Sequence, residues 1–287
     1  MMQSEQEGQR NLQQSGAAGQ RNTQHATNIK KRSMRRKKAR RMRRIKRIFV
    51  AAVILLVVFA AGRTSFVQGF LNHWNVKSEA TLTAEGYPES LVQLYEKNEE
   101  ARQFVLDYKK NGNNEQPIDI SSDVTDGKIP LFLQWDERWG YRTYGDNFLA
   151  ITGCGPTALS MVYVGLTGDT SMNPYAVAQM AQEDGFYVNG SGSAWSMMTE
   201  LATKLGLSAQ ELSLSEDSIR QELSQGHPII CIMGPGDFTT SGHFVVLTGV
   251  DSEGKITVND SNSKKNSNKA WKIEDLMSQI RDLWVYQ

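Results

Sequence analysis

TGCGPTAL, residues 152–159, places one of only two cysteines in the 287-residue chain between two glycines and directly before a proline. Proline is favoured in the first turn of a helix, because the N–H groups of that turn have no intrahelical acceptor. The stretch therefore predicts that a helix begins at Cys154. A helix amino terminus stabilises a thiolate, the nucleophilic form of cysteine. The alternative, a small buried core residue, does not account for the flanking glycines.

The surrounding residues, 129–287, predict one compact α+β domain. Its first half holds runs typical of helices, one after Cys154 and others that begin near Asn173, Ser193 and Ser215. Its second half holds the short β-branched runs HPIICIMG, HFVVLTGV and KITVND, with turn residues between them. Helices followed by an antiparallel sheet indicate the α+β class.

His243 is the candidate base for this thiol, because it follows a glycine and opens the apolar run HFVVLTGV. The other three histidines fit less well. His25 falls in a polar N-terminal arm, His73 lies beside an apolar segment, and His227 falls in a turn where an exposed residue is expected. The alternative for His243 is an ordinary histidine at a sheet edge.

A predicted hairpin supplies the carboxylate that would orient this imidazole. The turn DSEG joins HFVVLTGV to KITVND. If Val250 lies opposite Lys255, the same register places Asp260 opposite Val245. Asp260 is then diagonal to His243 on one face, about 7–8 Å away, a gap that the two side chains can close. Asp260 would fix the imidazole tautomer and leave the second ring nitrogen for the thiol.

Acyl transfer also requires donors for an oxyanion. The backbone N–H of Cys154 is one candidate, and the side-chain amide of Gln134 in IPLFLQWDERWG is the second. Alternatives remain for both assigned polar residues. Gln134 could be a surface glutamine, and Asp260 could serve a turn in NDSNS. A β-bulge in the hairpin would also shift the register on which the carboxylate assignment rests.

The second cysteine, Cys231, falls in the apolar run PIICIMG and is expected to pack in the core. A disulfide between Cys231 and Cys154 is the alternative in an exported protein, and it would block the nucleophile. Two distant cysteines lack zinc-ligand spacing, and the proposed chemistry requires no cofactor.

The domain resembles the C39-like peptidases of the papain-like superfamily. The resemblance is carried by QWDERWG, GCGPTAL, GHFVVLTG and VND, which occur in that order within residues 129–287. The preceding YPESLVQLYEKNEEARQFVLDY is similar to the upstream segment of membrane-anchored bacterial members.

This resemblance implies a papain-like cysteine peptidase fold, with the cysteine in a helical first half and the histidine and aspartate on an antiparallel sheet. It implies Cys154 as nucleophile, His243 as base, Asp260 as the orienting residue and Gln134 as oxyanion donor. Bacteriocin-exporter peptidases of this group cut after a Gly-Gly leader and are fused to an ABC transporter. This chain has no ATPase motif, so their leader-peptide substrate is not carried over.

The N-terminal part differs sharply in charge from the remainder. Residues 28–47 hold 13 of the 32 Lys and Arg, whereas residues 48–287 hold 17 basic and 29 acidic residues. Residues 1–47 are predicted to form a disordered, basic, cytoplasmic arm that contacts anionic lipid. Nucleic acid is not an expected partner, because the arm lacks aromatics and adjoins an apolar run.

The uncharged residues 48–62, extended to 71, predict a single-pass signal-anchor helix. The basic arm would hold the N-terminus in the cytoplasm and place the peptidase domain outside the cell membrane. Secretion after cleavage at a small-residue site is the alternative. Residues 72–128 are expected to be a connector that contains one amphipathic helix, 88–110, packed on the domain or serving as a stalk.

Together these features predict a membrane-anchored, extracytoplasmic cysteine peptidase that acts on a peptide or protein substrate through Cys154, His243 and Asp260. The first alternative is a catalytically silent module of the same fold that binds peptides or cell-wall stems. A second is an electrostatic adaptor that acts through its cytoplasmic arm. The sequence does not identify the substrate or the oligomeric state.

Overall fold

The structure, a computed structural model, describes residues 76–113 and 115–287. Residues 77–287 form one compact unit. The predicted arm, 1–47, and the predicted signal-anchor segment, 48–71, lie outside the described residues. Within the described ranges, no helix is both long enough and apolar enough to cross a bilayer.

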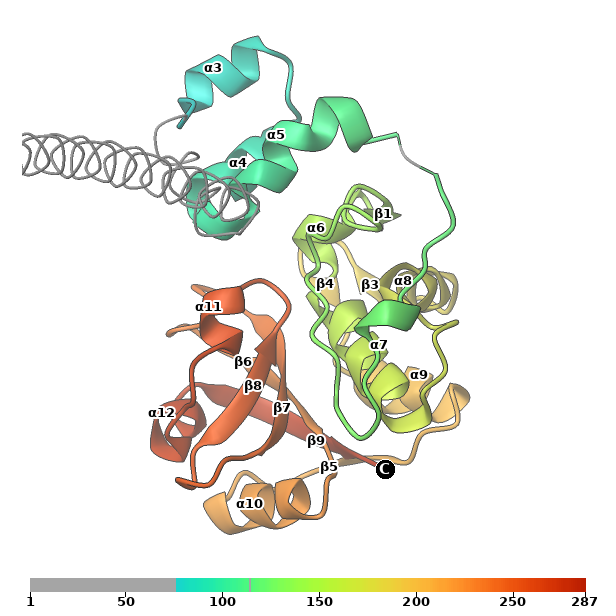
Figure 1. Cartoon of the computed structure of the whole chain (residues 1–287), viewed down its shortest axis with the longest axis vertical. Helices are drawn as coiled ribbons and strands as arrows, with labels where there is room; N and C mark the ends of the chain where they lie inside the picture. Colours follow the sequence, from blue (N-terminus) through green and yellow to red (C-terminus); the bar gives the residue numbers. More distant parts are fainter. Residues whose placement is uncertain (1–75, 114) are drawn as a thin grey trace, which may run out of the picture. The chain divides into compact units, whose positions relative to one another are not determined.

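A five-stranded antiparallel sheet forms one layer of this unit (Figure 1). Its strand order is β5-β9-β6-β7-β8. Three of these strands, β6, β7 and β8, were predicted from the sequence, whereas β5 and β9 were not. The strands are β5 Ala209–Glu211, β6 Ile229–Met233, β7 His243–Val250, β8 Ile256–Asp260 and β9 Ile280–Tyr286.

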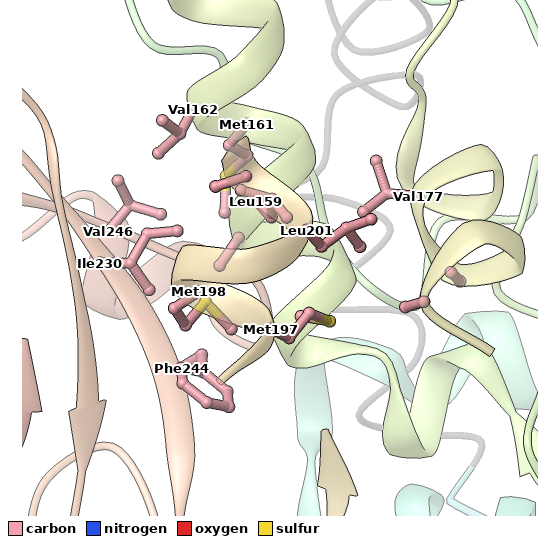
Figure 2. Close-up of a cluster of buried hydrophobic side chains, with 14 of the residues drawn as sticks. Leu159, Met161, Val162, Val177, Met197, Met198, Leu201, Ile230, Phe244 and Val246 are labelled. Atoms are coloured by element: carbon pink, nitrogen blue, oxygen red, sulfur yellow. The ribbon is translucent and has the colours of Figure 1, made fainter. Parts of the chain in front are cut away.

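Helices from the first half of the domain cover one face of the sheet. The central helix is α7, and it packs against β7, α8 and α9. Figure 2 shows its Leu159, Met161 and Val162 in a cluster with Ile230, Phe244 and Val246 of the sheet. The helices of this layer are α6 Leu149–Thr152, α7 Cys154–Thr167, α8 Pro174–Glu183 and α9 Met197–Lys204.

The opposite face of the sheet packs against a second apolar cluster. Because both faces of β6 are covered, all five of its residues are buried, and alternate residues enter the two clusters. Cys231 lies in the second cluster and is fully buried, which confirms its predicted place in the core. The helices that contribute to this cluster are α10 Glu216–Ser224 and α12 Ile273–Met277, whereas α11 Lys264–Ser267 contacts β8 without a buried side chain.

The upstream residues form a helical segment that packs on the domain. Its buried side chains share a third cluster with Leu133, Trp135 and Ala150. The elements are α3 Glu79–Ala84, α4 Glu89–Lys97, the 3-10 helix η1 Glu99–Ala101 and α5 Arg102–Asn111.

The single helix predicted over 88–110 is wrong in one respect, because the structure interrupts it at Asn98. The backbone of Asn98 is extended, with φ −129° and ψ 100°, and its side chain accepts a hydrogen bond from the N–H of Glu100. Asparagine competes in this way with the helical hydrogen-bond ladder. The continuous apolar periodicity concealed the break.

Short irregular elements complete the unit. Two hairpins flank the start of α7, and Ser193 lies in one of them rather than in the predicted helix. The elements are the 3-10 helix η2 Ser121–Asp123 and the strands β1 Thr143–Tyr144, β2 Asn147–Phe148, β3 Tyr187–Val188 and β4 Gly192–Ser193.

The β7–β8 hairpin reaches the predicted register by an unexpected route. Val250 lies opposite Ile256, not Lys255, so the turn is one residue longer than expected. A β-bulge between Leu247 and Gly249 restores the register. Val245 consequently lies opposite Asp260, as the sequence predicted.

Candidate active site

Cys154 is the first residue of α7, and Gly153 caps that helix. Its thiol is half-buried and not in a disulfide. The sulfur accepts hydrogen bonds from the backbone N–H groups of Phe244 and Gly155, and it also hydrogen-bonds to the imidazole of His243. The sulfur therefore lies where the start of α7 meets the start of β7.

The imidazole of His243 is held from its other side by a carboxylate. His243 Nε2 lies 2.7 Å from Asp260 Oδ1, and both side chains are buried. Because Nε2 is bonded to Asp260, the nitrogen that remains for Cys154 is Nδ1. The structure thus brings together three of the four predicted site residues.

Asp260 is itself held by its neighbours on the chain. Its Oδ1 accepts a hydrogen bond of 2.8 Å from the N–H of Asn262. Its Oδ2 accepts one of 2.8 Å from the side-chain amide of Asn266. Both carboxylate oxygens therefore have partners, which satisfies a buried charge that would otherwise be costly.

The electrostatics favour the charged forms of Cys154, His243 and Asp260. Burial raises the pKa of the Cys154 thiol, but the hydrogen bond and charge of His243 outweigh burial and lower that pKa below its usual value. Burial lowers the pKa of His243, but the charge and hydrogen bond of Asp260 outweigh it and raise that pKa. Burial raises the pKa of Asp260, whereas the charge of His243 lowers it, and the result is a lowered pKa. This arrangement supports a thiolate beside an imidazolium near neutral pH.

Gln134 hydrogen-bonds to neighbours of the site residues but makes no described contact with Cys154, His243 or Asp260. Its Nε2 donates to the carbonyl of Ala150 at 2.8 Å. Its Oε1 accepts from the hydroxyl of Ser261 at 3.0 Å, next to Asp260 in the chain. Gln134 is buried, not a surface residue.

Two residues beside the thiol had no assignment from the sequence. The hydroxyls of Tyr144 and Ser193 lie 2.9 Å apart and are both buried. Burial raises the pKa of Tyr144 to about 12, and the hydrogen bond between Tyr144 and Ser193 opposes that rise while the nearby Cys154 adds to it. Tyr144 therefore remains protonated at neutral pH. Both residues come from short hairpins, which local periodicity does not reveal.

Gly155, the glycine after Cys154, has a packing role that was not predicted. A Cβ added at Gly155 would lie 2.7 Å from Ser193 Oγ and 3.0 Å from the terminal carbon of Met197. The space at Gly155 is thus filled by protein side chains. The hydroxyl of Ser193 reaches the start of α7 because Gly155 has no side chain.

A cleft of about 640 Å³ opens over Cys154 and His243. That volume suits a segment of a peptide or a small molecule. Its walls include the turn between β3 and β4 and the end of β6. Lining residues besides the thiol and imidazole include Asp146, Tyr187, Ser193, Trp195, Gly234 and Arg281. Among the described residues, no group of three or more His, Cys, Asp or Glu is placed to hold a metal ion.

The domain combines helices and a sheet, and hydrogen bonds link a cysteine, a histidine and an aspartate near the start of its central helix. It has a peptidase-type fold. The chain belongs to the Peptidase_C39 like family, whose model matches residues 127–287.

Eight chains of solved structures also match. One is the peptidase domain of Streptococcus ComA, described as a bifunctional ABC transporter involved in a quorum-sensing pathway. It shares 19% sequence identity with this chain, with a TM-score of 0.36, over 47% of this chain and 89% of that one. No curated protein matches this chain.

Proposed function

We propose that this chain is a cysteine peptidase that hydrolyses peptide bonds in a peptide or protein substrate. The supporting observation is the buried imidazole of His243, which lines a cleft and forms hydrogen bonds with the Cys154 thiol and with Asp260. A thiol that is hydrogen-bonded to a base, which is in turn hydrogen-bonded to a carboxylate, is an arrangement used for nucleophilic acyl transfer.

Acylation begins when the Cys154 thiolate attacks the scissile carbonyl carbon and forms a C–S bond. The carbonyl π electrons move to oxygen, and the resulting oxyanion is stabilised by the N–H of Cys154. Gln134 is the proposed second donor, because its amide nitrogen has two hydrogens and Ala150 accepts one of them. The His243 imidazolium then gives its proton to the leaving nitrogen, and the C–N bond breaks.

Deacylation returns the enzyme to its starting state. Neutral His243 takes a proton from water, and the hydroxide attacks the thioester carbonyl. Collapse of the second tetrahedral intermediate breaks the C–S bond and releases the carboxylic acid, while the thiolate and the imidazolium are restored. Asp260 keeps the imidazole orientation through both half-reactions.

The proposed location is the outer face of a bacterial cell membrane. It is supported by the uncharged run 48–62 and the 13 basic residues of 28–47. The domain would act on extracytoplasmic peptides, with lipid contacts made by the anchor and basic arm. Secretion after cleavage of the anchor is the other outcome, and the mass of the chain in the membrane fraction distinguishes the two.

Peptide cleavage by the full-length chain tests this function. The chain is incubated with a mixed peptide library, and new termini are detected by mass spectrometry. We expect cleavage that is lost in Cys154→Ala and kept in Cys231→Ala, which changes a buried thiol outside the site. Equal product from wild type and Cys154→Ala would overturn the proposal. Binding of peptides without any cleavage would favour the catalytically silent module.

A further inference from the structure

The segment upstream of the matched family residues contacts the part of the chain that holds the candidate carboxylate. The family model matches 127–287, whereas α4, η1 and α5 precede it. The chain after Asp260, residues 261–266, is called here the Asp260 loop. Two of its members, Asn262 and Asn266, bond directly to the Asp260 carboxylate.

Asn98, at the break between α4 and η1, holds one end of this loop. Its Nδ2 donates to the carbonyl of Asn262 at 2.8 Å and to Asn262 Oδ1 at 2.9 Å. The indole N–H of Trp135 donates to the same carbonyl at 3.2 Å. Asn262 is therefore fixed through its carbonyl and side chain, while its N–H bonds to Asp260.

Glu100, in η1, holds the other end of the loop. Its Oε1 accepts from the hydroxyl of Ser263 at 2.6 Å and from the N–H of Lys265 at 3.3 Å. Its Oε2 accepts from the N–H of Lys264 at 2.9 Å. One half-buried carboxylate thus satisfies a side chain and two backbone groups at the start of α11, and charge-assisted hydrogen bonds of this kind are among the stronger ones.

We propose that Asn98 and Glu100 are positioning residues, which keep Asp260 aligned on His243 by fixing the Asp260 loop. The proposal rests on the proposed function. It gives the break at Asn98 a purpose, because an unbroken helix would not turn the Asn98 amide and the Glu100 carboxylate to the same loop. The upstream helices are then part of the working enzyme and not only a connector.

The physical consequence is a loss of order at the carboxylate when the upstream contacts are removed. Without Glu100, three donors at the start of α11 lose their acceptor and the Asp260 loop loosens. Asn262 and Asn266 then hold Asp260 less well, and its hold on His243 weakens. The pKa of His243 falls toward its unassisted value, so less thiolate forms at Cys154.

The test uses the full-length chain and the rate at which iodoacetamide alkylates Cys154, measured from pH 5 to 10. Cys231 is fully buried and serves as the unreactive thiol. We expect Glu100→Ala to slow alkylation at pH 6.5 by about fivefold or more, since each unit of pKa change is a tenfold change in the equilibrium. Glu99→Ala is the matched control, because Glu99 lies on the same turn with its side chain 81% exposed.

Asn98→Asp separates two roles of one side chain. The aspartate keeps an oxygen for the N–H of Glu100, so the start of η1 stays capped. It has no amide hydrogen to donate to Asn262. We expect Asn98→Asp to shift the alkylation profile in the same direction as Glu100→Ala. A profile that coincides with that of wild type in both variants would overturn the proposal.

A double-mutant cycle shows whether Glu100 acts through Asp260. In an Asp260→Asn background, Glu100→Ala is expected to add less than a twofold change, because the group that it positions has lost its charge. Multiplied single effects would instead show that Glu100 acts independently of Asp260 and would contradict the assignment. Because alkylation needs no substrate, these results stand apart from peptide cleavage, whose absence would reject only the proposed function.

A separate observation concerns a cation in the cleft. Arg281 is the only lysine or arginine among the described residues that line it. None of the ion pairs formed by described residues includes Arg281. Arg281 is exposed, and its guanidinium lies beside Gly234, the residue after β6, where an added Cβ would meet it.

We infer that Arg281 selects substrates with a carboxylate, either an acidic side chain or a C-terminus, at one end of the cleft. An arginine presents paired N–H donors that match a carboxylate. The acidic residue on the cleft lining, Asp146, already bonds to the hydroxyl of Tyr187. This inference also rests on the proposed function, and it names the class of substrate.

Peptide binding to the full-length Cys154→Ala chain tests this inference without cleavage. Peptide libraries that differ only in Glu or Gln at each position are compared by fluorescence anisotropy. We expect about fivefold tighter binding of one Glu peptide, lost in Arg281→Gln and reversed in Arg281→Glu. Lys110→Gln, an exposed cation of α5, is the control. The same Glu preference in Arg281→Gln, or no preference in the parent, would overturn it.

Discussion

His243 Nε2 lies 2.7 Å from Asp260 Oδ1, which leaves Nδ1 of the same ring for the thiol of Cys154. Asp260→Asn keeps the shape of this group and removes its charge. Burial would then lower the pKa of His243 without an opposing carboxylate, by about 1–3 units. We expect kcat at pH 7 to fall by about 10–1000-fold, and the alkaline limb of the pH profile to move to lower pH. An unchanged alkaline limb would show that Asp260 does not set the charge of the ring.

Gln134→Ala tests the second oxyanion donor. Loss of one such donor costs about 10²–10³-fold in kcat, with little change in KM. The substitution also removes the hydrogen bonds of Gln134 to Ala150 and Ser261, so a lower midpoint of urea unfolding is expected as well. If kcat changes by less than about threefold while the midpoint falls, Gln134 is structural and the oxyanion has another donor.

Gly155→Ala is expected to destabilise the chain by about 1–3 kcal/mol, because the added methyl group would overlap the side chain of Ser193. Urea unfolding measures this change. Ser193→Gly makes room for the methyl group but leaves the buried Tyr144 hydroxyl without its partner, so it is destabilising by itself. Gly155→Ala is therefore expected to cost clearly less in a Ser193→Gly chain than in the wild type. An equal cost in both chains would mean that the loss arises elsewhere, for example in the backbone of α7.

Cys231→Ala removes a buried thiol from the second cluster and is expected to lower the free energy of unfolding at pH 7.5 by about 1–2 kcal/mol. The loss should shrink at alkaline pH. Burial raises the pKa of the folded Cys231 thiol, so its stabilisation is complete below the unfolded pKa of about 8.5 and falls above it.

At pH 10 the wild type would lose about 2 kcal/mol that Cys231→Ala does not lose. Urea titrations of both proteins at the two pH values measure this difference, and Cys154 is common to both. A constant difference between the two proteins would contradict the assigned burial.

Much of the site could be predicted because the sequence marks its anchor points strongly. The proline and glycines around Cys154 mark a helix start, and the residue after Gly242 opens a strand. The register that joins His243 to Asp260 was predicted on a wrong pairing at the turn. It held because a longer turn and a β-bulge compensate, and neither has a clear local signal.

Other features depend on contacts between distant residues. The break at Asn98 is stabilised by Asn262, which is 164 residues away in the sequence. Ser193 pairs with Tyr144 across 49 residues. Strand β9 carries charged residues at its start, and its place between β5 and β6 arises from long-range pairing. Periodicity within a short window contains none of this information.

The most direct test of the account is the pH dependence of Cys154 alkylation in wild type and in His243→Ala. We predict that wild-type Cys154 reacts rapidly well below the pH at which a free thiol ionises. In His243→Ala, the half-buried thiol should react only at clearly higher pH. Superimposable profiles for the two proteins would contradict the thiolate and imidazolium pair on which the proposed peptidase depends.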